Sequence, residues 1–208
     1  MKKHSDLSAT PEFAQTELNS SFVLGFVKPE ANQKTKEIFN YFKRWNFELI
    51  YSKRVLLKKW QALSYYARDD GWKRQVGGYA LYSHDPHYKY SPEECLAQGE
   101  IILQKIIEYM ISDEIELFIF RLPLERGNAI EKANQLIGYT NPRRALPGTI
   151  RWDLFHKDEN LSSINDEDGF LFNFIDLCKE EKDMAEAIAI LIPEKDSRKY
   201  KFLSHIKI

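Results

Sequence analysis

Residues 138–151 read GYTNPRRALPGTIR and form the most distinctive segment of the chain. Its two prolines each fix the backbone φ angle near about −65°, and Gly148 permits a turn that a Cβ atom would obstruct. We therefore expect a rigid loop that leads directly into a strand. Stiff backbone would hold the Thr140 hydroxyl and the forked Arg151 guanidinium in place, which suits recognition of a phosphoryl group.

Length and composition predict one elaborated domain, because 208 residues that are 43% hydrophobic can bury a core. Lys and Arg total 30 against 31 Asp and Glu, so the net charge of −1 gives no long-range attraction to nucleic acid or to an anionic membrane. The two cysteines, Cys95 and Cys178, form no metal-ligand pattern, so we expect no metal site. Neither a signal peptide nor a membrane-spanning apolar run is apparent, and we expect a cytoplasmic protein.

Hydrophobic periodicity predicts alternating strands and helices along most of the chain. Strands are expected from short apolar or alternating runs, at residues 21–27, 47–57, 115–122 and 149–155. Helices are expected where apolar residues recur three and four apart, at residues 31–45, 59–70, 91–111, 128–137 and 179–191. Residues 71–90, rich in Gly, Tyr and His, are expected to be irregular.

This order predicts an α/β (α+β) fold, a ferredoxin-like βαββαβ sandwich with extra helices between the second and third strands. The domain would span residues 21–193, with a helical insertion at residues 71–111. Residues 1–20 lack periodicity and are expected to form a flexible N-terminal arm, and residues 194–208 a C-terminal tail.

A lysine at the end of the first strand strengthens the phosphate hypothesis. Lys28 lies at the carboxyl end of a buried strand, where ligands commonly bind in α/β layers. The segment FVKPE around it resembles the I-K-P-D of nucleoside diphosphate kinases, and residues 140–151 resemble that family's T-N-P-x-x-x-x-P-G-T-I-R segment. The resemblance extends from about Ser21 to Pro193 and includes features of the longer bacterial and archaeal members.

The resemblance implies a nucleotide site with five contact residues. Lys28 would act as a point charge, Thr140 as a hydroxyl donor and Arg151 as a forked guanidinium donor to the phosphates. Asn173 matches the family residue that touches the sugar, and Tyr66 matches a tyrosine near the phosphates.

Three of these residues also have an ordinary structural interpretation, which the sequence leaves open. Lys28 would then be a solvated lysine at a strand end, Arg151 an internal ion-pair partner of Asp153, and Tyr66 merely part of the core.

The family's catalytic histidine is replaced in this chain. In the family this histidine, in an N-x-x-H motif, accepts the γ-phosphate of one nucleotide and passes it to a nucleoside diphosphate. The matching residues 173–176 read NFID, so Asp176 stands in its place, and an ungapped alternative puts Ile164 there. Ala187 matches the glutamate that orients the histidine, and Asn134 matches a phosphate-gripping arginine. These losses predict weak or absent phosphotransfer.

Three functions follow from these observations. The first is a protein that binds nucleoside di- or triphosphates together with Mg²⁺, and the resemblance implies a homo-oligomer because family members are usually dimer-based assemblies. The second keeps phosphotransfer through Asp176 or a nearby histidine such as His156, expected at the end of the fourth strand. The third is an interaction module whose cleft binds no nucleotide and whose partner surface is marked by the aromatic side chains Tyr79, Tyr82, Tyr88 and Tyr90.

Overall fold

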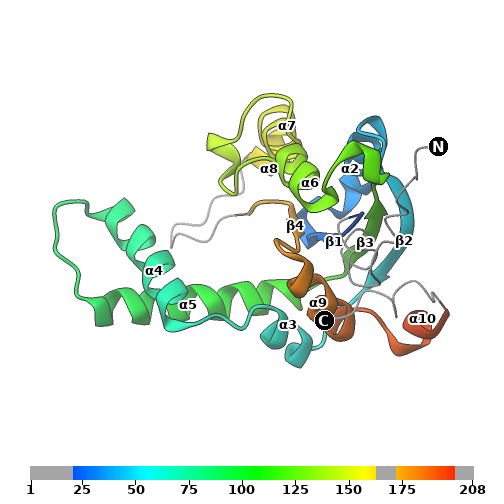
Figure 1. Cartoon of the computed structure of the whole chain (residues 1–208). Coiled ribbons are helices and arrows are strands. Elements are labelled where there is room, and N and C mark those ends of the chain that lie inside the picture. The colour runs from blue at the N-terminus through cyan, green and yellow to red at the C-terminus, as the bar shows by residue number, and fades with distance from the viewer. Residues whose placement is uncertain (1–20, 163–171, 200–208) are drawn as a thin grey trace, which may run out of the picture.

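A four-stranded antiparallel sheet lies at the centre of the molecule, with strand order β2-β3-β1-β4 (Figure 1). The computed structural model describes residues 21–162 and 172–199. Its strands are β1 (Phe22–Val27), β2 (Glu48–Val55), β3 (Ile115–Arg121) and β4 (Ile175–Leu177). This strand order and the helices between the strands confirm the predicted ferredoxin-like sandwich. The predicted arm at residues 1–20 lies outside the described residues.

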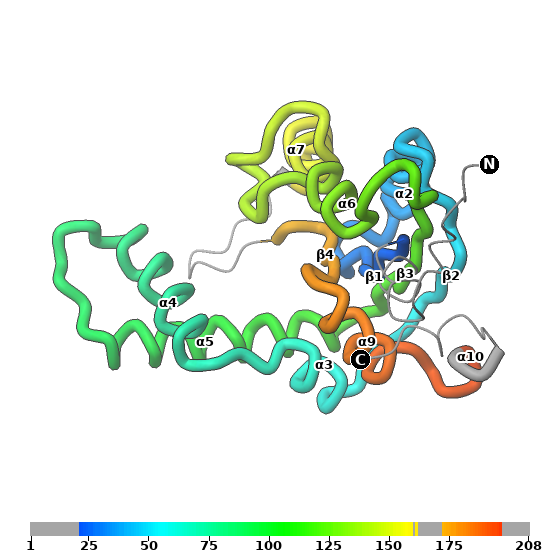
Figure 2. Tube along the Cα trace, in the orientation of Figure 1, coloured from blue at the N-terminus to red at the C-terminus, as the bar shows by residue number. Residues whose placement is uncertain are grey.

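Helices cover both faces of the sheet, so each face has its own hydrophobic core (Figures 1 and 2). One face carries η1 (Pro29–Lys34), α2 (Thr35–Arg44), α6 (Ala129–Ile137) and α7 (Ile150–Lys157). The other face carries α3 (Lys59–Tyr65), α5 (Pro92–Met110) and α9 (Glu181–Leu191). The strand β1 alternates between the two cores, with Val23 and Val27 in the first and Leu24 and Phe26 in the second.

Five further elements complete the described chain. They are α4 (Asp70–His84), η2 (Leu124–Arg126), η3 (Pro142–Arg144), α8 (Glu159–Ser162) and α10 (Glu194–Lys199). No helix in residues 21–162 and 172–199 combines the length and the apolar character that crossing a bilayer requires. Apart from the two segments discussed next, the predicted helices and strands are confirmed with shifted boundaries, and the helix predicted at residues 59–70 ends at Tyr65.

Residues 71–84 are helical, so the prediction of an irregular segment at 71–90 is wrong for most of its length. The Asp69 side chain caps α4 by accepting a hydrogen bond from the Trp72 N–H at 2.7 Å. The helices α4 and α5 project from the sheet and pack on each other, at the left of Figure 1. A Cβ atom on Gly77 would overlap the Cys95 carbonyl, so the two backbones can approach only because this residue is a glycine.

Residues 150–157 are also helical, so the prediction of a fourth strand at residues 149–155 is wrong. The β-branched residues of the GTIR segment favoured a strand, but other spacings in this segment indicate a helix. Ile150 and Leu154, four residues apart, are both buried on the sheet side. Lys157 pairs with Asp153 at 2.7 Å, again four residues apart. The fourth strand is instead β4, which has only three residues.

The contact between α4 and α5 predicts opposite effects for two adjacent glycines. Gly77→Ala is expected to lower the free energy of unfolding by about 1–3 kcal/mol, because its Cβ meets fixed backbone atoms. Gly78→Ala is the matched control, since its Cβ would lie 3.5 Å from the Cys95 Sγ, an ordinary contact. Alanine is the better helix former, so this variant should gain up to about 1 kcal/mol. Urea unfolding of both variants measures the difference, and equal effects would disprove the close approach.

Candidate functional site

A cleft of about 620 Å³ lies at the edge strand β4, where helices from both faces of the sheet meet. Its walls come from α3, α4, α5 and α9, from β4, and from the end of α6 with the loop and the start of α7 that follow it. Segments far apart in the sequence therefore meet at this cleft. It is lined by all six residues that the sequence assigned to the site: Lys28, Tyr66, Thr140, Arg151, Asn173 and Asp176.

Lys28 is buried at the inner end of the cleft, with 7% of its surface exposed. Its Nζ donates a hydrogen bond to the Asn173 Oδ1 at 2.7 Å. Burial lowers the pKa of Lys28 below its ordinary value of 10.5, and the charges of Asp176 and Glu30 oppose this change. The alternative of a solvated strand-end lysine is therefore wrong.

Arg151, at the start of α7, uses its guanidinium on the backbone. Its Nε donates to the carbonyl oxygen of Asn173 at 3.1 Å, and its two Nη atoms donate to the carbonyls of Gly138 and Ile175, each at 2.8 Å. Burial lowers the pKa of Arg151 to about 10, while Asp176 opposes this change. Asp153 pairs with a lysine instead, so the alternative of an Arg151–Asp153 ion pair is wrong. The guanidinium therefore links α7 to the C-terminal end of α6 and to the start of β4.

The segment before β4 makes a strained turn at Phe174. Phe174 has a φ angle of 67°, and the Ile175 N–H donates to the Asn173 carbonyl at 2.8 Å. This is a γ-turn with positive central φ, the rare and strained form. The Lys28 N–H donates to the Phe174 carbonyl at 2.9 Å, and the Phe174 N–H donates to the Glu30 Oε1 at 2.9 Å. Together with the guanidinium contacts above, these bonds hold the turn in place.

Glu30 supports the site without lining the cleft, and the sequence analysis missed it. Its second carboxylate oxygen accepts a hydrogen bond from the Tyr109 hydroxyl of α5. Burial raises the pKa of Glu30, and the neighbouring charge of Lys28 is the largest opposing influence. Its position two residues after Lys28 could have drawn attention to it. Its partners Tyr109 and Phe174, however, lie 79 and 144 residues away along the chain.

Asp176 lies on β4 opposite Phe26 of β1, and its side chain lines the cleft. Its Oδ2 accepts a hydrogen bond from the Tyr66 hydroxyl at 3.2 Å, and its Oδ1 accepts one from the Leu177 N–H at 3.1 Å. Burial first, and then the charge of Asp176, raise the pKa of Tyr66 well above its usual value. Tyr66 is therefore a buried phenol that belongs to the core and also lines the cleft.

None of the three histidines in residues 21–162 and 172–199 lines the cleft. His84 ends α4 and His87 follows it in a turn. His156 lies on α7 rather than at a strand end, and its ring stacks on Trp152 with centroids 4.5 Å apart. Over the same residues, no three His, Cys, Asp or Glu side chains gather closely enough to hold a metal ion. Ala187 on α9 does line the cleft.

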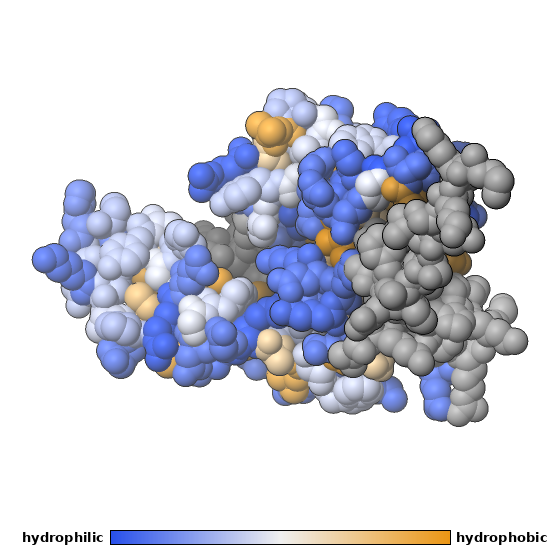
Figure 3. Space-filling model, viewed as in Figure 1, coloured by the Kyte–Doolittle hydropathy of each residue, from blue (hydrophilic) through white to orange (hydrophobic). Residues whose placement is uncertain are grey.

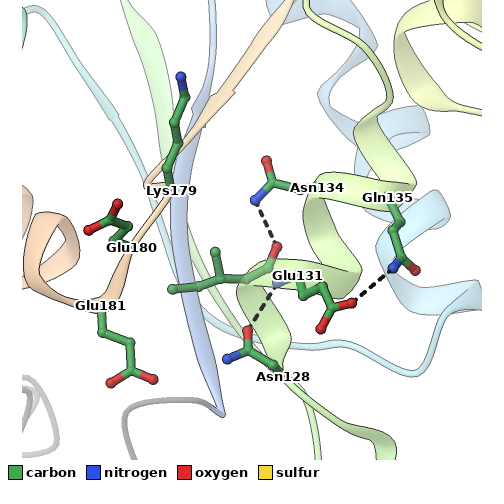
Figure 4. A pocket seen from close by; sticks show the side chains of 8 residues that line it. Asn128, Glu131, Asn134, Gln135, Lys179, Glu180 and Glu181 are labelled. Atoms are coloured by element: carbon green, nitrogen blue, oxygen red, sulfur yellow. Dashed lines mark hydrogen bonds between the residues drawn. The ribbon is translucent and has the colours of Figure 1, made fainter.

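A second hollow, of about 600 Å³, adjoins the cleft between α6 and the start of α9 (Figure 4). The two hollows share Asn134 and Lys179. Polar groups of the second hollow are largely satisfied within α6, as Figure 4 shows: the Asn134 amide donates to the Ile130 carbonyl, and the Asn128 side chain accepts from the Glu131 N–H. Its donors do not converge on a common point, so the first cleft is the better candidate site.

Known proteins resemble this chain in sequence as well as in structure. No family model matches the chain. The nucleoside diphosphate kinase of Pyrobaculum aerophilum is 26% identical over 156 residues, which cover 72% of this chain and 82% of that relative. The nucleoside diphosphate kinase of Legionella pneumophila strain Paris is 25% identical over 165 residues, covering 74% and 94%.

Solved structures of the same kind of enzyme share the fold. The crystal structure of the Pyrobaculum aerophilum enzyme matches with a TM-score of 0.67 and 25% identity, over 84% of this chain and 97% of that one. A Borrelia burgdorferi nucleoside diphosphate kinase with bound vanadate and ADP matches with a TM-score of 0.58 and 21% identity, over 84% and 88%. The resemblance to the nucleoside diphosphate kinase family is therefore confirmed.

The burial of Lys28 predicts a pH-dependent effect of removing its charge. Because the pKa of Lys28 is lower in the folded chain than in the unfolded one, the unfolded chain binds more protons between the two values. Lys28 therefore destabilises the fold below its folded pKa, and this cost fades as the pH rises toward 10.5. Lys28→Met should raise the free energy of unfolding at pH 7, with a smaller gain at alkaline pH.

Urea unfolding at several pH values measures this effect. Lys59→Met is the control, because Lys59 is exposed at the start of α3. It should change the free energy of unfolding by no more than about 0.5 kcal/mol at any pH. A Lys28→Met variant that is less stable at pH 7, with no trend toward alkaline pH, would contradict the burial of a charged amine.

Proposed function

We propose that this relative of the nucleoside diphosphate kinases binds nucleoside di- or triphosphates in the cleft, and that phosphotransfer through a phosphohistidine is weak or lost. The observation that carries the proposal is the position of Asp176. It lies in the cleft among Lys28, Tyr66 and Arg151, where the resemblance places the histidine. A phosphate-binding environment is thus combined with a carboxylate that cannot act as an imidazole does.

Several features of the cleft support nucleotide binding. Its volume falls within the range of about 300–1,000 Å³ that is usual for small-molecule sites. Lys28 and the Thr140 hydroxyl offer donors to phosphate oxygens, and Asn173 offers an amide to the sugar. Trp72 and Ile102 add an apolar wall against which a base can lie. Arg151 would support the phosphate site through the backbone that it fastens.

Two features argue against a phosphohistidine intermediate. No histidine in residues 21–162 and 172–199 lines the cleft. Ala187 stands where the family's orienting glutamate is expected, and its methyl group can neither orient nor polarise a ring nitrogen. Carboxylates do form acyl phosphates in other enzymes. Asp176 is shorter than a histidine, however, and its two oxygens already accept hydrogen bonds.

The cleft fits Mg²⁺ as an ion carried by the nucleotide. Mg²⁺ usually binds through substrate phosphates, water and one or two carboxylates, and it neutralises phosphate charge. Asp176 is the carboxylate in the cleft lining whose charge has the largest effect on the pKa of Lys28, and it is the candidate for such a carboxylate. A homo-oligomeric, cytoplasmic protein is proposed from the family resemblance alone.

Binding and transfer are measured separately. Mg-ADP is expected to raise the thermal midpoint of the protein, because a ligand that binds only the folded state stabilises it. Incubation with γ-labelled ATP is expected to leave no label that is labile in acid and stable in base, the combination that marks phosphohistidine. Asp176→His alone should label only weakly, and Asp176→His with Ala187→Glu should label more strongly, since the glutamate can orient the ring.

The same measurements decide between the remaining functions. Base-labile label on the wild-type protein would show an acyl phosphate on Asp176 and restore the enzyme hypothesis. Strong labelling of Asp176→His alone would contradict the role assigned to position 187. A midpoint unmoved by any nucleotide would favour the interaction module.

The exposed tyrosines give that module partial support. Tyr79, Tyr82 and Tyr88 have 72%, 43% and 51% of their surface exposed, and the Tyr82 and Tyr88 rings also pack on Tyr90 with centroids 5.1 and 4.6 Å away. On the face seen in Figure 3, the most hydrophobic residues appear as small separate groups among hydrophilic ones.

A further inference from the structure

Opposite charges are balanced in the lining of the cleft. Among the described residues, its cations are Lys28, Arg68, Arg151 and Lys179, and its carboxylates are Asp69, Asp176, Asp183 and Glu186. A cleft that concentrates strongly anionic ligands usually carries an excess of positive charge. This lining has none, so its preference among anions depends on where each charge lies.

The two buried cations at the inner end already have internal partners. The Lys28 ammonium donates to the Asn173 side chain, and the Arg151 guanidinium donates to three carbonyls. Asp176 is the carboxylate in the cleft lining whose charge acts on both, since it opposes the effect of burial on each of their pKa values, and Glu30 has the same effect on Lys28. The Asp176 carboxylate therefore supplies part of the negative charge that an entering phosphate would otherwise supply.

Asp176 is also fixed in position. Its backbone belongs to β4 and pairs with Phe26 of β1. Its carboxylate is held by the Tyr66 hydroxyl and the Leu177 N–H. Thr140, in contrast, is exposed at the mouth of the cleft, as is Lys179. Anionic groups thus meet exposed donors at the mouth and a fixed, half-buried negative charge toward the buried Lys28 and Arg151, where the effective dielectric constant is lower than in bulk water.

We infer that Asp176 makes the cleft select nucleoside diphosphates over nucleoside triphosphates. The inference deepens the proposed function and rests on it. A nucleoside diphosphate places its phosphates against Thr140 and Lys179 and stops short of the carboxylate. The third phosphate of a triphosphate extends toward Lys28, where it must compete with Asp176 for the cations. The diphosphate is expected to bind at least tenfold more tightly, which corresponds to about 1.4 kcal/mol.

Isothermal titration calorimetry with ADP and with the β,γ-imido analogue of ATP, at one Mg²⁺ concentration, tests the inference. The wild-type protein should show the tenfold preference for ADP. Asp176→Asn keeps the size of the side chain and an oxygen for the Tyr66 hydroxyl but removes the charge. This variant should bind the triphosphate analogue more tightly and leave ADP affinity within about threefold, so that most of the preference disappears.

Asp183→Asn is the matched control, because it removes one carboxylate from the lining of the same cleft and leaves Asp176 in place. Its preference for ADP should equal that of the wild type. Loss of the preference in Asp183→Asn as well would trace it to the overall charge of the cleft and overturn the inference. Equal or tighter wild-type binding of the triphosphate analogue would also overturn it, whether or not Asp176→Asn folds.

Nucleotide binding and the preference for nucleoside diphosphates are distinguished by different results. Nucleotides that bind without a preference for ADP would contradict the selection by Asp176 and leave nucleotide binding intact. A wild-type protein that binds neither nucleotide would contradict the proposed function itself.

Discussion

The strained turn at Phe174 is the constraint on which the site depends. A residue other than glycine in this region of φ costs about 1–3 kcal/mol. The turn persists because Glu30 accepts its N–H, Lys28 donates to its carbonyl, and Arg151 donates to the carbonyls on either side. The turn directs Asn173 toward Lys28 and starts β4, which carries Asp176 into the cleft. This backbone conformation therefore sets the positions of Asn173 and Asp176.

The chain maintains these groups at a cost to its stability. Lys28, Glu30 and Arg151 all have pKa values shifted by burial in the direction that disfavours charge. Ordinary cores avoid such groups, and departures of this kind are expected at functional sites. The cleft therefore concentrates buried ionisable groups in the way that a site for a charged ligand does. The proposed binding and the proposed loss of phosphotransfer are compatible, because they depend on different residues.

The sequence predicted the parts that local pattern determines. The apolar runs of β1 and β3 and the capping box at Ser91 gave the correct elements. The local pattern gave a wrong prediction where tertiary contacts decide the structure. Gly77 does not form a turn but allows the close contact between α4 and α5. The six site residues came from motif resemblance, and the cleft brings them together. The partners of Arg151 and Glu30 could not be predicted, because they are backbone groups and one distant hydroxyl, that of Tyr109, whose positions only the folded chain defines.

A crystal structure of the protein with saturating Mg-ATP tests most directly whether this cleft binds a nucleotide without transfer of its phosphoryl group to a side chain. We expect the phosphates to lie in the cleft within hydrogen-bonding distance of the Thr140 hydroxyl or the Lys28 ammonium, and every side chain to remain unphosphorylated. A phosphoryl group on Asp176 or on a histidine would contradict the loss of transfer. A nucleotide bound elsewhere, with the cleft empty, would contradict the assignment of the site.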